Sequence, residues 1–232
     1  MVSWQTVAAT NNAEWCDLIC GTHGAPTRFD EDAWTSRRRT PPGYPDAVTL
    51  VPNPPVPELL TRIDTAVGCS VKDSFASVDM TAYGFRVLFD AQWIVHRAPA
   101  IPPSRDGAHW EVVHDGAGLG AWERAWRGND GPPGVFRTEL LDHDSVTVLA
   151  AHAGSSVVAG AVLNRSSTVV GVSNFFTHDP CGAGSWSGCL ALAAALFPGS
   201  TFVGYESGQT LVAAQTHGFD TVGPLRVWIH ED

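Results

Sequence analysis

A glycine-containing turn at residues 181–185, Cys-Gly-Ala-Gly-Ser, has the residue types of a phosphate-binding turn. Its two glycines carry no Cβ, so the backbone can approach a ligand closely. A helix predicted at residues 187–196 would direct its free N–H groups and the positive end of its dipole at an anion. The turn predicts a pyrophosphate site. Because a lone Gly-x-Gly is a weak signal, the surrounding elements must decide its meaning.

Two other clusters have the residue types of a metal site. Cys16, Cys20 and His23 lie close together, but no fourth ligand follows at a usual spacing, so the cysteines are expected to pack a helix. Residues 142–144, Asp-His-Asp, stand between predicted elements and are expected to be a solvated turn. We therefore expect no metal.

Two serines and the single lysine are weaker candidates for catalytic or binding groups. Ser187 and Ser207 each precede a glycine but lack the full Gly-x-Ser-x-Gly elbow, which argues against a hydrolase. Lys72 is the only lysine among 14 basic residues. Either its ammonium serves an acidic or phosphate group, or it is a surface lysine paired with Asp73, which is the favoured interpretation.

Composition limits the class of protein. The chain has 232 residues, 44% of them hydrophobic, and a net charge of −10, which disfavours a polyanionic partner. Its one basic cluster, residues 37–39, is expected to be a solvated turn. Five scattered cysteines, no membrane-length apolar run and no signal-like start favour a cytoplasmic protein with reduced thiols.

Proline-rich stretches at residues 52–57 and 98–103 interrupt the chain, and the second suggests a division into residues 1–103 and 104–232. The first part reads as an α/β half. Its expected elements are a helix at 11–21 with an asparagine cap, a strand at 47–51, a helix at 57–65, and a hairpin of residues 75–80 with a strand starting at 85.

The second part has a more regular pattern. Strands are expected from 110, at 146–150, 157–163, 168–176, 201–205 and 225–229, and helices at 118–127, 187–196 and 209–217.

From residue 109 onward the chain resembles the GNAT superfamily of acyl-CoA-dependent N-acyltransferases. The resemblance is carried by three segments in the family's order: 172–176, 181–184 and 213–219, the last ending in Gly-Phe before a strand. It implies an α/β fold with a mixed, mostly antiparallel central sheet flanked by helices. It also allows the N-terminal half to be a degenerate second copy of the fold.

The resemblance implies that an acyl-CoA, acetyl-CoA first among them, lies between the strands at 168–176 and 201–205. Separated strands leave backbone groups that can pair with a pantetheine arm, while the turn holds the pyrophosphate. The implied donor-binding residues are Asn174, Phe175, Phe176 and Thr177 on the strand, and Gly182, Ala183, Gly184 and Ser185 on the turn.

Three residues depart from the family pattern. Cys181 stands where Arg or Gln is usual, and Ala214 replaces a tyrosine that often protonates the leaving thiolate. Trp186 stands where Gly or Ala is common. Its indole either blocks the pyrophosphate, stacks on an adenine or packs the helix against the core.

Catalytic groups are therefore sought at the strand ends. Glu206 is the first choice of general base, because partial burial would raise its pKa, and His178 is the second. Tyr205 is the expected acid for the thiolate. The alternatives are a helix cap for Glu206, an exposed loop residue for His178 and a core position for Tyr205.

The sequence thus favours an enzyme that moves an acyl group from acyl-CoA to an amine of a small molecule. One alternative keeps the fold but takes an aminoacyl group from aminoacyl-tRNA. Arg37, Arg38, Arg39 and Arg165 gathered at the cleft would support that donor. Another is a non-catalytic binding module. We expect no membrane partner, and a monomer or homodimer.

Overall fold

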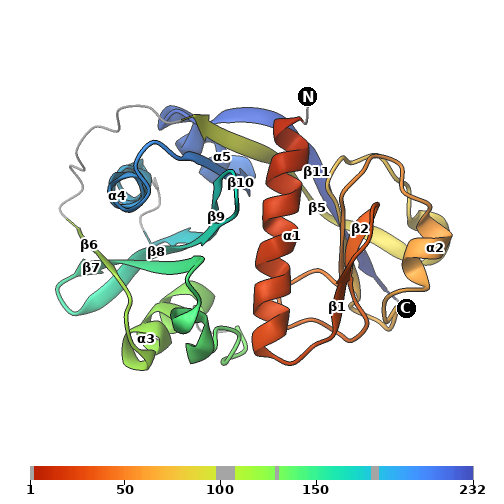
Figure 1. Ribbon diagram of the computed structural model, residues 1–232, viewed down its shortest axis with the longest axis horizontal. Helices are drawn as coiled ribbons and strands as arrows, with labels where there is room; N and C mark the ends of the chain where they lie inside the picture. Colours follow the sequence, from red (N-terminus) through yellow and green to blue (C-terminus); the bar gives the residue numbers. More distant parts are fainter. Residues whose placement is uncertain (1–2, 98–107, 129–130, 179–182, 232) are drawn as a thin grey trace. The chain divides into compact units, whose positions relative to one another are not determined.

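The computed structural model describes residues 3–97, 108–128, 131–178 and 183–231 (Figure 1). The chain forms two compact units. The first comprises Met1–Trp93 and Val222–Asp232, and the second Ile94–Thr221. Strands β5 (Phe85–Arg97) and β11 (Asp220–His230) contribute to both units. The boundary expected between residues 103 and 104 lies outside the described residues.

In the first unit the strands follow the order β1-β2-β3-β4-β11-β5. β3 and β4 are parallel, whereas β1, β2 and β3 pair antiparallel in sequence and β4 pairs antiparallel with β11. The remaining elements of this unit are α1 (Trp4–Thr22), β1 (Thr27–Phe29), β2 (Ala33–Ser36), β3 (Ala47–Thr49), α2 (Val56–Leu60), β4 (Ser70–Asp73) and the 3₁₀ turn η1 (Thr81–Tyr83).

Two helices cover opposite faces of these strands. Val71 of β4 belongs to a core cluster with Leu59 of α2. The next residue, Lys72, faces the other way and its Nζ donates to Asn12 Oδ1 of α1 at 2.7 Å. Alternation along a strand explains the difference. The buried Lys72 contradicts the expected surface pair with Asp73, whose carboxylate accepts backbone N–H groups, that of Ser77 among them.

Two expected elements of this half are wrong. The first helix starts at Trp4 rather than 11, because Ser3 caps it by accepting the Thr6 N–H, which leaves Asn12 in mid-helix. Residues 75–80 form no strand. The hairpin is replaced by η1, and β5 pairs with β11 and β10 instead.

In the second unit the strands follow the order β5-β10-β9-β8-β7-β6. β9 and β10 are parallel, and β6, β7, β8 and β9 pair antiparallel in sequence. The elements are β6 (His109–Val112), α3 (Gly116–Arg127), the 3₁₀ segment η2 (Thr138–Asp142), β7 (Val146–Ala153), β8 (Ser156–Arg165), β9 (Val170–Thr177), α4 (Ala183–Leu196), β10 (Thr201–Glu206) and α5 (Gly208–Thr216).

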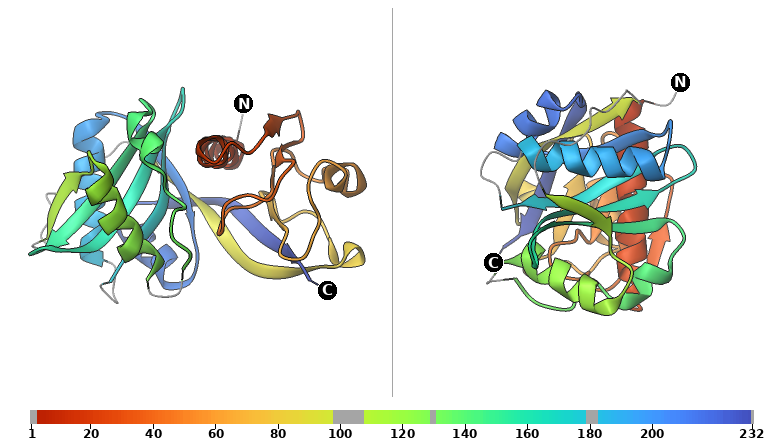
Figure 2. Two further views of the ribbon diagram at one scale, coloured as in Figure 1. Left: turned by 90° about the horizontal axis from the view of Figure 1, so that it is seen from below. Right: turned by 90° about the vertical axis from the view of Figure 1, so that its left-hand side faces the viewer.

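Helices α3 and α4 lie on opposite faces of this sheet (Figure 2). Ala161 of β8 belongs to the core cluster that includes Trp186 and Leu190 of α4. A Cβ on the preceding Gly160 would instead collide with Trp122 of α3. The sheet is therefore buried on both faces, which explains the nearly continuous apolar sequence of β8.

The expected fold class is confirmed: the protein is α/β, with a mixed, mostly antiparallel sheet flanked by helices. The strands and helices expected in the second part are present, with ends shifted by a few residues. Within the described ranges, no helix has the length and apolar character needed to cross a bilayer.

Candidate functional site: a gap between two parallel strands

A bulge interrupts β9 where the donor site was expected. Gly160 of β8 pairs with Phe176 and Val162 with Ser173, so Ala161 faces two residues, Asn174 and Phe175. Asn174 has a φ of 52°, a left-handed conformation that asparagine tolerates better than most residues. A bulge bends its strand and leaves backbone groups without ladder partners.

The parallel strands β9 and β10 are joined only near their beginnings. Phe202 pairs with Val170 and Val203 with Gly171. A Cβ on Gly204 would lie 2.8 Å from the Val172 carbonyl oxygen, so the strands are still close at that point. β9 then continues through the bulge to Thr177 while β10 ends at Glu206, and no further ladder pair joins these described residues. The carboxyl ends of the two strands border a gap.

The helix after β9 starts earlier than expected. α4 begins at Ala183, which places Gly184 and Ser185 in its first turn rather than in a loop. Cys181 and Gly182 lie outside the described residues. The Thr177 and Ser185 hydroxyl oxygens are 2.8 Å apart, so a hydrogen bond ties the end of β9 to the first turn of α4. The amino end of α4 is thereby fixed beside the end of the bulged strand.

Trp186 packs into the core. Its ring stacks on Phe175 with centroids 4.0 Å apart and contacts Phe219 edge-on at 5.1 Å, and the residue is 1% exposed. Of the three alternatives for this indole, packing the helix against the core is the one observed. The ring helps to hold α4 against the bulge.

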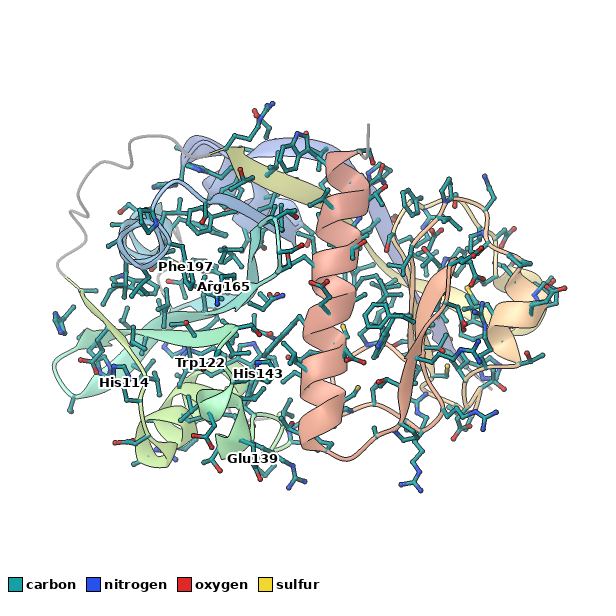
Figure 3. The ribbon with its side chains drawn as sticks, in the orientation of Figure 1. His114, Trp122, Glu139, His143, Arg165 and Phe197 are labelled. Carbon is teal, nitrogen blue, oxygen red and sulfur yellow. The ribbon has the colours of Figure 1, made fainter. Side chains whose placement is uncertain are left out.

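Phe176 and His178 project to the other face of the sheet, toward α3. Phe176 contacts Trp122 edge-on at 5.4 Å, and His178 Nε2 lies 3.2 Å from the Ala125 carbonyl oxygen. Trp122 lies between α3 and the strands (Figure 3), where its Nε1 donates to the Leu149 carbonyl oxygen at 2.8 Å. The Phe175 and Phe176 side chains therefore lie on opposite faces of the sheet. His178 is exposed on the α3 side.

Glu206 and Tyr205 end β10, with side chains on opposite faces because they are neighbours on a strand. Phe202 of the same strand packs in the core cluster that includes Trp186 of α4. Side chains an even number of residues apart on a strand share a face, so Glu206 faces the α4 side too. Burial raises the pKa of Glu206 to about 7, against a hydrogen bond from Thr210 that lowers it. Tyr205 is partly buried. Glu206 therefore has the pKa that a general base needs near neutral pH.

A carboxylate that was not predicted organises the segment after α3. Glu123 is buried and accepts backbone N–H groups from Gly134, Val135 and Phe136 at 3.2, 2.6 and 3.0 Å. Phe136 in turn packs edge-on against Trp122 at 4.8 Å. The only signal in the sequence was a glutamate on the face of a helix that also carries a tryptophan, which by itself favours a solvated position.

Cys16 and Cys20 are buried in α1, and the described part of the chain has no group of three or more His, Cys, Asp or Glu able to hold a metal. Asp142 ends η2, and His143 Nδ1 lies 3.0 Å from the Ser145 hydroxyl at the surface.

Of the arginines that would support a tRNA donor, Arg165 belongs to the unit that contains the gap, and residues 37–39 belong to the other unit. In the first unit, Arg39 forms an ion pair with Asp46 at 2.9 Å. In the second, Arg165 ends β8 beside the start of β9, whereas the gap lies at the end of β9.

No family model and no curated protein match the sequence. Solved structures with a similar fold exist. A GCN5-related N-acetyltransferase from Kribbella flavida superposes with a TM-score of 0.60 at 14% identity, covering 97% of this chain and 96% of that one. The chain has the GNAT fold. A GCN5-related N-acetyltransferase-like protein from Streptococcus suis 89/1591 gives a TM-score of 0.55 at 16% identity and covers 98% of both chains.

A conserved protein of unknown function from Staphylococcus epidermidis ATCC 12228 gives a TM-score of 0.62 at 11% identity, covering 90% of this chain and 95% of that one. The two GCN5-related structures match nearly the whole of this chain, residues of its N-terminal half included. Identities this low establish the fold alone.

Proposed function

We propose that the protein is an N-acyltransferase that moves an acyl group, acetyl first among the candidates, from a CoA thioester to an amine of a small molecule. The observation that carries the proposal is the gap between β9 and β10 beyond Val172, with a bulge at Asn174 on one side and Glu206 on the other. Such a gap offers backbone groups to the amides of a pantetheine arm.

The residues present fit an acyl-CoA donor. Gly184 and Ser185 stand in the first turn of a 14-residue helix, where free N–H groups and the helix dipole favour a pyrophosphate. Thr177 and Ser185 add hydroxyl groups at the same place. Trp186 faces the core and leaves this turn uncovered by its indole. Bound there, the donor supplies an activated thioester.

Glu206 is the proposed general base. Its pKa of about 7 leaves a large fraction ionised at neutral pH. That carboxylate can accept, through a water, the proton that the acceptor's ammonium group loses before the neutral amine attacks the thioester. Tyr205, on the opposite face of β10, is the proposed acid that protonates the leaving thiolate. Residues on opposite faces of one strand end can act on opposite sides of a thioester held in the gap.

His178 is the second candidate for the base. Its Nε2 is engaged with the Ala125 carbonyl oxygen at 3.2 Å, so only Nδ1 is available to accept a proton. The segment held by Glu123 lies on the same α3 side and is proposed to border the acceptor amine. We propose that the protein acts as a monomer or a homodimer.

A thiol-release assay tests the function. Acetyl-CoA is incubated with panels of alkyl amines, aromatic amines and amino acids, and amine-dependent release of CoA is followed. We expect release with at least one class and a roughly hundred-fold lower kcat in Glu206→Gln, the usual size of a lost general base. The matched control is Glu139→Gln, an exposed carboxylate in η2. Full activity of Glu206→Gln would contradict the role of Glu206.

A further inference from the structure

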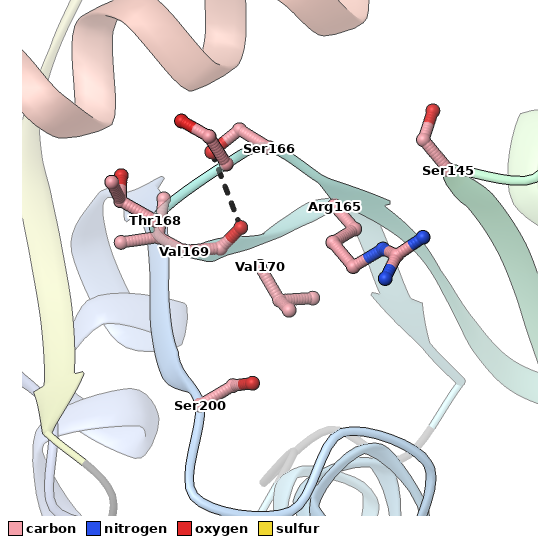
Figure 4. Close-up of a pocket in the computed structure, with 8 residues that line it drawn as sticks. Ser145, Arg165, Ser166, Thr168, Val169, Val170 and Ser200 are labelled. Carbon is pink, nitrogen blue, oxygen red and sulfur yellow. Dashed lines mark hydrogen bonds between the residues drawn. The ribbon is translucent and has the colours of Figure 1, made fainter.

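A second cavity lies at the other end of the strands that form the gap. It has a volume of about 430 Å³ and is open to solvent. Its lining comes from the residue before β7, the end of β8, the β8–β9 turn, the first residue of β9 and the residue before β10. These residues are Ser145, Arg165, Ser166, Ser167, Thr168, Val169, Val170 and Ser200. We call this cavity the Arg165 pocket. Figure 4 shows Arg165 and Ser200 on either side of Val170.

Arg165 supplies a positive charge that no carboxylate neutralises. The lining contains no Asp or Glu, and within the described ranges the guanidinium forms no ion pair or hydrogen bond. Several other arginines do form ion pairs: Arg39 with Asp46, Arg97 with Asp220 and Arg226 with Asp90. In a protein with a net charge of −10, an unneutralised guanidinium in a cavity is a site for an anion.

Hydroxyl groups share the lining of the pocket with this charge. Ser166 Oγ donates to the Val169 carbonyl oxygen, and Ser145 Oγ lies 3.0 Å from His143 Nδ1. The hydroxyl groups of Ser167, Thr168 and Ser200 form no hydrogen bond with any described residue. A tetrahedral oxyanion suits such a site, since its oxygens accept bonds from several directions while two of them match the guanidinium fork.

We propose that the Arg165 pocket binds the phosphate group of a small phosphorylated molecule. Its volume falls in the range of small-molecule sites, roughly 300–1,000 Å³, and leaves room for more than the phosphate. Val169 and Val170 give the remainder of the ligand an apolar wall. The carboxyl end of α4, at Leu196, opposes an anion near Ser200, but a partial dipole charge is weaker than a full guanidinium charge.

The pocket is separate from the donor site. Val170 starts β9 and Thr177 ends it, a run of 8 residues, which places the two sites roughly 20 Å apart along the strand. The proposal does not rest on the acyltransferase function, because the pocket can bind its ligand whether or not the gap binds acyl-CoA.

The test is an NMR titration of the amide signals of the full chain with inorganic phosphate, methyl phosphate and sulfate at constant ionic strength. We expect saturable shifts at residues 165–170 and at Ser200, with methyl phosphate binding at least as tightly as inorganic phosphate. Arg165→Gln should bind about ten-fold more weakly or worse, as expected for the loss of a charged, forked donor. Arg165 is exposed, so this variant should fold.

The matched control is Arg124→Gln, an exposed arginine on α3 away from the pocket, which should bind as the wild type does. Equal shifts in wild type and Arg165→Gln, or shifts confined to the first turn of α4, would overturn the proposal. So would binding of inorganic phosphate with none of methyl phosphate, because the pocket would then exclude a phosphorylated molecule.

Discussion

The ring of Phe175 stacks on that of Trp186 with centroids 4.0 Å apart and 17° between the planes. Phe175 belongs to the bulge of β9, and Trp186 to the first turn of α4. The hydrogen bond between Thr177 and Ser185 joins the same two elements. One aromatic pair and one hydroxyl pair thus help to hold the amino end of α4 beside the end of β9.

Shortening the Trp186 side chain should lower the denaturant concentration at which the second unit unfolds. Trp186→Ala removes a fully buried ring and should cost about 3–5 kcal/mol of unfolding free energy. Trp186→Phe keeps a ring against Phe175 and should cost about 1–2 kcal/mol, because the buried Trp186 Nε1 has no hydrogen-bond partner to lose among the described residues. Urea unfolding followed by circular dichroism measures both.

Trp34→Phe is the matched control in the first unit, since Trp34 Nε1 donates to Asp17 at 3.0 Å. That variant should cost more than Trp186→Phe. The reverse order would show that the Trp186 indole N–H has a partner.

The bulge can be tested through its backbone conformation. Asn174 has a φ of 52°, so Asn174→Val should cost about 1–2 kcal/mol of stability and weaken binding of acetyl-CoA, while Asn174→Gly should preserve both. Asn53, exposed in the first unit with a φ of 51°, is the matched control. Asn53→Val should lose similar stability and bind acetyl-CoA normally. If both valine variants lost acetyl-CoA binding equally, the bulge at Asn174 would not be part of the donor site.

The sequence predicts the fold of the second unit because its strands and helices are regular and separated by glycine and proline. It predicts the donor strand but not the bulge, since only the preference of Asn174 for a left-handed conformation marks it. For the role of Trp186 the sequence allows three alternatives, because a single sequence does not show which way an indole points. The sequence does not predict the burial of Glu123 and favours a surface position for Lys72, for one reason: charged residues are usually solvated, and only tertiary contacts reveal the partners that allow burial.

Glu206 should give opposite pH dependences in activity and stability. A base with a pKa of about 7 must be ionised to act, so kcat/KM should rise with pH through about 7. In the unfolded chain the same carboxyl group titrates near 4.5, so the folded state binds more protons between these values. Its stabilising contribution is complete below about pH 4.5 and is lost as the pH rises through 7.

Glu206→Gln should therefore become more stable relative to the wild type as the pH rises from 4.5 to 8, by as much as about 3 kcal/mol, while losing activity. Urea titrations at several pH values measure the difference. A constant difference across this range would show that Glu206 has an ordinary pKa.

Glu123→Gln should loosen the segment after α3. The substitution keeps the shape but removes the charge that accepts three N–H groups, and should cost about 2 kcal/mol. The amides of Val135 and Phe136 should exchange with deuterium faster, whereas Glu139→Gln should leave them protected. If the acceptor amine lies there, its KM should rise more than kcat falls. Unchanged protection in Glu123→Gln would exclude the carboxylate as the organiser of this segment.

Calorimetric titration with acetyl-CoA and free CoA tests the donor site most directly. The wild type should bind both with micromolar affinity, and Gly184→Trp should abolish binding, because a bulky side chain in the first turn of α4 would occupy the place of the pyrophosphate. Ser167→Trp, which places the same bulk in the exposed turn at the other end of β9, should bind normally. Absence of binding in the wild type, or equal binding by Gly184→Trp, would contradict an acyl-CoA site at the gap.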